Sequence, residues 1–127
     1  MEDKTIHSYR DLIVWQKAME LVAVVYELTE LFPKSEIYGL ISQMRRSAVS
    51  IPSNIAEGRR RGSRKDYRQF LLIAYSSGAE LETQVEIAKR LSIIEHMQCE
   101  KIDGLISETM RMLNKMISSM NPKKLTS

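Results

Sequence analysis

The sequence predicts an all-α protein, an antiparallel up-down-up-down four-helix bundle. Apolar residues recur at spacings of three and four along four segments of the chain. Only five glycines and three prolines occur among 127 residues, so turns are few. Short connections between the segments place consecutive helices side by side. We expect one domain, residues 1–127, with helices at about 8–32, 36–60, 63–91 and 96–120 and a flexible tail at 121–127.

The first predicted helix carries two adjacent apolar rows, which together form a wide apolar face. It ends at Phe32-Pro33, because a residue before proline avoids the α region. Further apolar residues outside both rows exceed what a small bundle needs and predict a subunit interface, unless they are exposed singly. The rows are Leu12, Trp15, Met19, Val22, Tyr26, Thr29 and Ala18, Leu21, Val25, Leu28, Phe32, and the extra residues are Ile13, Val14 and Val24.

Pro52 lies inside the second predicted helix. Ser35 is the expected N-cap, with Glu36 in the first turn. Pro52 removes a backbone donor, yet the apolar spacing continues across it, which favours one helix kinked at Pro52. The alternative is a break, with Ser50 capping a new helix. The apolar row comprises Ile37, Ile41, Met44, Ala48, Ile51 and Ile55.

The third and fourth predicted helices have clearer limits. Ser63 caps the third helix and Asp66 follows three residues later, a weak capping box. Asn121-Pro122 ends the fourth. Their apolar seams are Tyr67, Leu71, Ala74, Gly78, Leu81, Val85, Ala88 and Cys99, Ile102, Ile106, Thr109, Leu113, Met116, Met120.

The net charge of +3 is unevenly distributed. Between Arg45 and Arg68 there are eight basic and two acidic residues. Arg64 and Lys65 open a helix, where positive charge is unfavourable, and this local conflict indicates a polyanion partner. The alternative is a basic turn that faces solvent and has no binding role. The predicted nucleic-acid-binding residues are Arg59, Arg60, Arg61, Arg64, Lys65 and Arg68.

Arg45 and Arg46 lie on the helix that carries the second apolar row. They either extend the basic surface or pair with Glu80, Glu82 or Glu86 of the third predicted helix. We expect the pairing, across the bundle or between subunits, because arginine is favoured in interface ion pairs. Asn54 either satisfies backbone groups freed by the kink at Pro52 or lines a subunit contact, and we expect the structural role.

Catalytic, metal and cofactor signals are weak, so we expect no enzyme, no metal and no cofactor. His96 and Cys99 are three residues apart, but two ligands do not make a zinc site, and His7 is distant. No glutamate precedes a histidine by three, and no phosphate-binding glycine loop occurs. A single cysteine and no long apolar run suggest a cytoplasmic protein without membrane contact.

Several stretches resemble the 23S rRNA intervening-sequence proteins over roughly residues 9–91. They are WQKAMEL at 15–21, Phe32-Pro33, EIYGLISQMRRSAVSIPSNIAEG at 36–58, Phe70-Leu71 and ELE at 80–82. The resemblance implies a helical bundle that assembles into a ring, commonly a pentamer. It also implies related bundles that accompany reverse transcriptases of diversity-generating retroelements and bind nucleic acid there. The family carries an old ribosomal-protein label.

The sequence therefore predicts a non-enzymatic homo-oligomeric bundle that contacts RNA or DNA phosphates through its basic turn. The alternative is an oligomeric scaffold that binds only protein.

Overall fold

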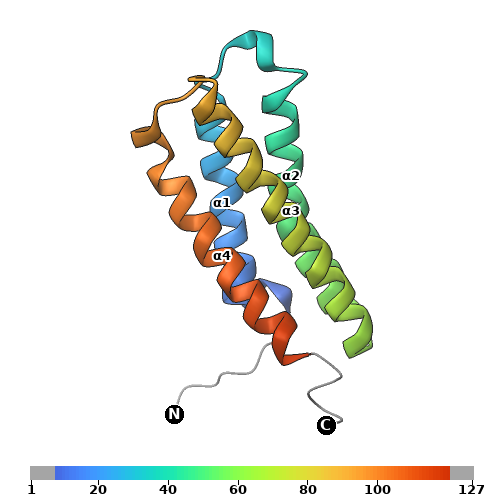
Figure 1. The fold of residues 1–127 in the computed structure, drawn as a ribbon. Helices are drawn as coiled ribbons and strands as arrows, with labels where there is room; N and C mark the ends of the chain where they lie inside the picture. Colours follow the sequence, from blue (N-terminus) through green and yellow to red (C-terminus); the bar gives the residue numbers. More distant parts are fainter. Residues whose placement is uncertain (1–7, 121–127) are drawn as a thin grey trace.

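The computed structural model describes residues 8–120, and Figure 1 shows the fold. Four helices, α1 (Ile13–Thr29), α2 (Leu40–Arg60), α3 (Arg64–Arg90) and α4 (Glu100–Ser119), make up the bundle. Single 3-10 turns at Tyr9–Asp11, Lys34–Glu36 and His96–Cys99 precede α1, α2 and α4. No strand occurs in the described range, which confirms the predicted all-α four-helix bundle. The predicted tail at 121–127 lies outside that range.

Each helix packs against the next one along the chain, and α4 also packs against α1. The turns between α1 and α2 and between α3 and α4 lie at one end of the bundle, and the turn between α2 and α3 lies at the other (Figure 1). Contacts agree with this arrangement: Lys89 of α3 pairs with Asp103 of α4 at 2.7 Å, and Lys17 of α1 lies 3.6 Å from Glu108 of α4.

The helix α1 buries one of its two predicted apolar rows completely and the other only in part. It is shorter than expected at both ends, with Ser8 capping a separate 3-10 turn that precedes it. Val14 and Val24 are buried in the core, so for these two residues both the predicted interface role and the alternative of single exposure are wrong, whereas Ile13 is exposed. Met19 and Tyr26 of the other row are also exposed. The buried row is Ala18, Leu21, Val25, Leu28 and Phe32.

The helix α2 passes through Pro52 without interruption. The alternative of a new helix capped at Ser50 is therefore wrong, whereas a bend at Pro52 stays a prediction. Asn54 lies beside the proline, and its side-chain amide donates to the Ser50 carbonyl at 2.8 Å and to the Ser50 hydroxyl at 3.0 Å. This local role is structural, as expected.

The predicted N-cap at Ser35 is wrong. Residues Lys34–Glu36 form a 3-10 turn, and α2 begins only after Gly39. A carboxylate oxygen of Glu36 accepts from the Leu40 backbone amide at 3.3 Å, so this acid serves the start of α2 from outside the helix. Ile37 consequently lies outside α2 and is exposed, unlike the rest of its row.

The predicted cap of α3 is confirmed: the Ser63 hydroxyl accepts from the Asp66 amide at 3.0 Å. The helix α4 starts later than expected, because His96–Cys99 forms a 3-10 turn. The seams of both helices enter one apolar core, with Tyr67, Met116 and Met120 only partly buried at its edge. Within residues 8–120, no helix combines the length and apolarity needed to cross a bilayer.

Candidate nucleic-acid interface

The turn between α2 and α3 holds the basic segment at one end of the bundle. Gly58 is buried at the end of α2, and a Cβ placed there would lie 2.7 Å from the Phe70 Cβ. Because glycine has no side chain, the two helices approach closely here. Only residues 61–63 separate the helices, so the arginines of α2 and the basic residues of α3 stand next to one another.

The arginines at the end of α2 make contacts within this end of the bundle. Arg61 pairs with Glu57 at 2.9 Å, and its guanidinium lies 4.8 Å from the centre of the Phe70 ring. Arg60 lies 5.7 Å from the centre of the Tyr9 ring. Cations also suit a helix C-terminus, where the backbone carbonyls carry partial negative charge. These arginines therefore have a structural use beside any binding role.

Arg64 and Arg68 reach across to the end of α4. Arg64 donates to the Ser119 carbonyl at 3.5 Å, and Arg68 donates to the Ile117 carbonyl at 3.3 Å. Both carbonyls belong to the last turn of α4, where positive charge is favourable. The unfavourable positive charge at the start of α3 is thus partly offset by backbone carbonyl groups at the end of α4. The partners of these two hydrogen bonds are 55 and 49 residues apart in sequence, and no sequence pattern indicated either bond.

Lys65 is exposed, and Tyr67 is half-buried beside it. Burial raises the pKa of the Tyr67 hydroxyl, and the positive charge of Arg59 opposes that rise in part. The charge of Arg59 therefore acts on Tyr67, while the ammonium of Lys65 faces solvent. The six predicted basic residues all lie at this end of the bundle. Together with Arg10 and Lys115 they form what we call the basic end.

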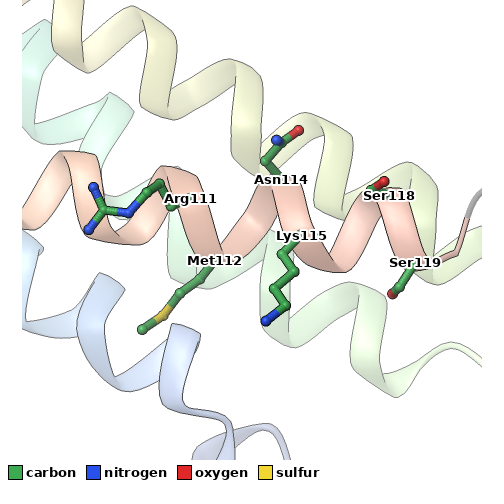
Figure 2. Close-up of a pocket in the computed structure, with 6 residues that line it drawn as sticks. All are labelled: Arg111, Met112, Asn114, Lys115, Ser118 and Ser119. Carbon is green, nitrogen blue, oxygen red and sulfur yellow. The ribbon is translucent and has the colours of Figure 1, made fainter.

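Further cations that the sequence reading missed extend the basic end. Lys115 lines an open groove of about 700 Å³ along α4, with Asn114 before it and Ser118 after it, and Arg111 lines the same groove nearer the middle of the helix. Figure 2 shows these side chains along α4, with Met112 directed toward α1. Arg10 belongs here too, since it shares the Tyr9 ring with Arg60. The spacing of four between Arg111 and Lys115 was the available signal.

Two aromatic rings at the basic end, those of Tyr9 and Phe70, have arginine side chains against them. The Tyr9 ring has Arg10 at 5.0 Å and Arg60 at 5.7 Å from its centre, and Arg61 covers the Phe70 ring. An aromatic platform for nucleic acid has to offer a free face to a base. The arrangement therefore suits phosphate groups better than stacked bases.

The expected ion pairs of Arg45 and Arg46 with Glu80 or Glu82 are not formed within the chain. Arg45 instead binds the end of α1, donating to the Thr29 hydroxyl at 2.8 Å and pairing with Glu30 at 3.2 Å. Its guanidinium also lies 4.4 Å from the centre of the Tyr26 ring. The partner is on α1 because that helix packs beside this side of α2. Arg46, Glu80 and Glu82 are exposed.

Cys99 is not placed for nucleophilic chemistry. Its side chain is fully buried, whereas His96 is exposed. Burial raises the pKa of the Cys99 thiol, and the positive charge of Lys89 offsets this only in part. A neutral, buried thiol is a weak nucleophile. Among residues 8–120 no three His, Cys, Asp or Glu side chains gather in a way that could hold a metal ion; His7 lies outside that range.

The sequence model of the family described as 23S rRNA-intervening sequence protein matches residues 10–115. The chain belongs to this family. The match extends through most of α4, beyond the stretch on which the sequence resemblance rested.

A solved structure supports the assignment of the fold. It is the crystal structure of a protein of unknown function from the S23 ribosomal protein family of Bacteroides thetaiotaomicron. It is 27% identical, superposes with a TM-score of 0.77, and the match covers 83% of this chain and 98% of that one. No curated protein sequence gives a significant match. Neither the family description nor that of the similar structure names an enzyme.

Proposed function

We propose that this intervening-sequence family protein is a non-enzymatic homo-oligomer whose basic end contacts the phosphate backbone of RNA or DNA. One observation carries the proposal: cations from all parts of the bundle gather at a single end, although the total charge is only +3. Arg10 precedes α1, and the others come from α2, α3 and α4. Most acidic residues within 8–120 lie on the opposite half of the bundle, although Asp11, Glu57 and Asp66 lie at the basic end.

Phosphate is the chemistry that this arrangement favours. Arginine presents forked donors that match phosphate oxygens, and helix-borne cations are held at set positions. The covered Tyr9 and Phe70 rings leave few faces for bases. We therefore expect binding that is strongly salt-dependent and nearly indifferent to sequence. Repetition of the basic end around a ring, such as the pentamer that the family resemblance implies, would multiply these contacts.

The test compares two triple charge reversals of equal net charge. One changes exposed cations of the basic end, Arg60→Glu, Lys65→Glu and Lys115→Glu. The other changes exposed cations of the opposite end, Lys34→Glu, Arg90→Glu and Lys101→Glu. Fluorescence anisotropy with a generic RNA and a generic DNA, at several salt concentrations, measures affinity.

We expect the basic-end variant to lose binding and to lower the salt slope by roughly two to three, since each phosphate contact contributes about 0.7–0.9. The opposite-end variant should retain most of the affinity. Equal loss in both variants would indicate a general charge effect, and no binding by the unaltered protein would refute the nucleic-acid role.

A second candidate function is a scaffold that binds protein. Exposed apolar side chains on α1 and α2, including Met19 and Val49, favour it.

We place the protein in the cytoplasm, where a single reduced cysteine is the norm.

A further inference from the structure

An apolar groove runs between α1 and α2. Its volume is about 340 Å³. It contains Trp15, Met19 and Val22 of the first apolar row of α1. Met19 and Val49 at its rim are exposed. The lining residues are Tyr9, Trp15, Met19, Val22, Val49, Pro52, Ser53 and Ala56.

A stripe of exposed residues on α3 combines two isoleucines with an acid. Ile73, Glu80 and Ile87 are spaced by seven residues, so they lie on one face of the helix. Ile73 is 46% exposed and Ile87 is 40% exposed, which is unusual for isoleucine. The stripe borders the side of α3 that faces α2, because Ser77, four residues from Ile73, contacts Ser50 of α2 at 2.7 Å.

The positions of these residues along the bundle axis, here called their heights, follow from the pairing of α2 with α3. Ser50 and Ser77 are level, and the two helices run in opposite directions, since Gly58 lies against Phe70. Four residues back from Ser50 is Arg46, and three residues on from Ser77 is Glu80. Their heights agree within about 1.5 Å, the rise of one residue.

The same comparison places Ile73 level with the groove. Four residues back from Ser77 is Ile73, and four residues on from Ser50 is Asn54, next to Ser53 of the groove lining. Ile87 lies far from this height, near the start of α2. Copies related by rotation about an axis along the bundle keep their heights. Ile73 of one copy can thus meet the groove of the next.

We propose that the groove between α1 and α2 receives Ile73 from a second copy of this chain, and that Arg46 pairs with Glu80 of that copy. This inference rests on the proposed homo-oligomer and names its contact. Charge complementarity supports the second copy as occupant: Arg46 lies one turn from Val49 at the groove, Glu80 lies two turns from Ile73, and both charges are exposed. Neither forms an ion pair elsewhere within residues 8–120.

The two surfaces lie on neighbouring sides of the bundle rather than on opposite sides. The groove opens between α1 and α2, and the stripe borders the α2 side of α3. A contact between different surfaces is head-to-tail, and each added copy turns by the angle between them. Neighbouring faces give a large turn, which favours a small closed ring over a straight fibre.

Light scattering and sedimentation across a range of concentrations test the contact. Ile73→Glu should raise the dissociation constant by about tenfold or more, because it places a charge in an apolar groove at the centre of the contact. The matched control is Ile87→Glu, on the same stripe but at another height, which should change it by less than about threefold. Arg46→Glu and Glu80→Arg should each weaken assembly, and the double reversal should restore it.

Thermal unfolding of each variant at low concentration shows whether the monomer still folds, so that misfolding is not mistaken for lost assembly. If the unaltered protein is monomeric at all concentrations, the homo-oligomer in the proposed function is wrong. If it assembles, but Ile73→Glu and Arg46→Glu assemble equally well, this contact alone is wrong. If Ile87→Glu disrupts assembly as strongly as Ile73→Glu, the proposed height match is wrong.

Discussion

Gly58 of α2 lies directly against Phe70 of α3, and any side chain at Gly58 would overlap it. A Cβ there would be 2.7 Å from the Phe70 Cβ and 3.2 Å from the Tyr67 carbonyl oxygen. Both neighbours sit on the backbone or next to it, so neither can move aside cheaply. This contact sets the separation of the two helices immediately before the basic turn.

Gly58→Ala should therefore lower the free energy of unfolding by about 1–3 kcal/mol, the usual cost of overpacking. Chemical denaturation measured by circular dichroism gives the value. Gly104→Ala is the matched control, because a Cβ on this helical glycine meets nothing within 4 Å. It should stabilise α4 by about 0.5–1 kcal/mol. Destabilisation of similar size in both variants would argue against the close approach at Gly58.

Arg45 should contribute more to stability than an ordinary surface arginine. It supplies a donor to the hydroxyl of Thr29, which is buried, and pairs with Glu30. Arg45→Met should cost about 1–3 kcal/mol, since the buried hydroxyl loses a partner. Arg90→Met removes only an exposed pair with Glu86 and should cost less than about 0.5 kcal/mol. Equal melting temperatures for the two variants would contradict this reading.

The cations of the basic end should divide into two groups. Arg68 binds the Ile117 carbonyl, so Arg68→Gln should lower both the melting temperature and the affinity for nucleic acid. Lys65 faces solvent, so Lys65→Gln should lower affinity while changing stability by less than about 0.5 kcal/mol. Differential scanning fluorimetry and a binding titration on the same samples separate the two effects. A melting temperature unchanged in Arg68→Gln would mean that its hydrogen bond to α4 adds nothing.

The protein should lose stability at alkaline pH. Burial raises the pKa of Cys99 and of Tyr67, and the hydrogen bond to Asp103 raises the pKa of Lys89. For a group whose folded pKa is raised, the folded state binds more protons, so the contribution is complete below the unfolded pKa and disappears as pH rises through the folded value.

The fall should begin near pH 9, where an unfolded cysteine ionises. Denaturation midpoints from pH 7 to 11 give the trend. Cys99→Ala should remove the part of the stability loss that begins near pH 9. A midpoint that stays constant or rises over this range would contradict the expected sign.

The apolar spacing was sufficient to predict the four helices and most of the core, because each seam repeats within a single helix. Ser35 misled the prediction, since a good capping residue can also stand in a 3-10 turn. The periodicity of α1 also left open which of its two rows enters the core, because it shows which residues share a face and not what covers that face.

The roles of Arg64 and Arg68 could not be predicted for a different reason. Their partners are backbone carbonyls of α4, and a carbonyl has no residue type that a sequence reveals. The partner of Arg45 was misassigned because Glu30 and Glu80 are equally plausible acids until the helices are placed in space. Contacts between distant segments depend on packing, and local patterns do not encode them.

The close seam between α2 and α3 also has a mechanical consequence. Ser50 against Ser77 and Gly58 against Phe70 join the two helices as a stiff hairpin, and the basic turn is its tip. A polyanion approaching this tip meets charges whose spacing is already set, so little chain entropy is lost on contact. A loosely tethered lysine-rich tail would have to be ordered at each encounter, whereas the cations of this turn are already held at fixed positions by the two helices.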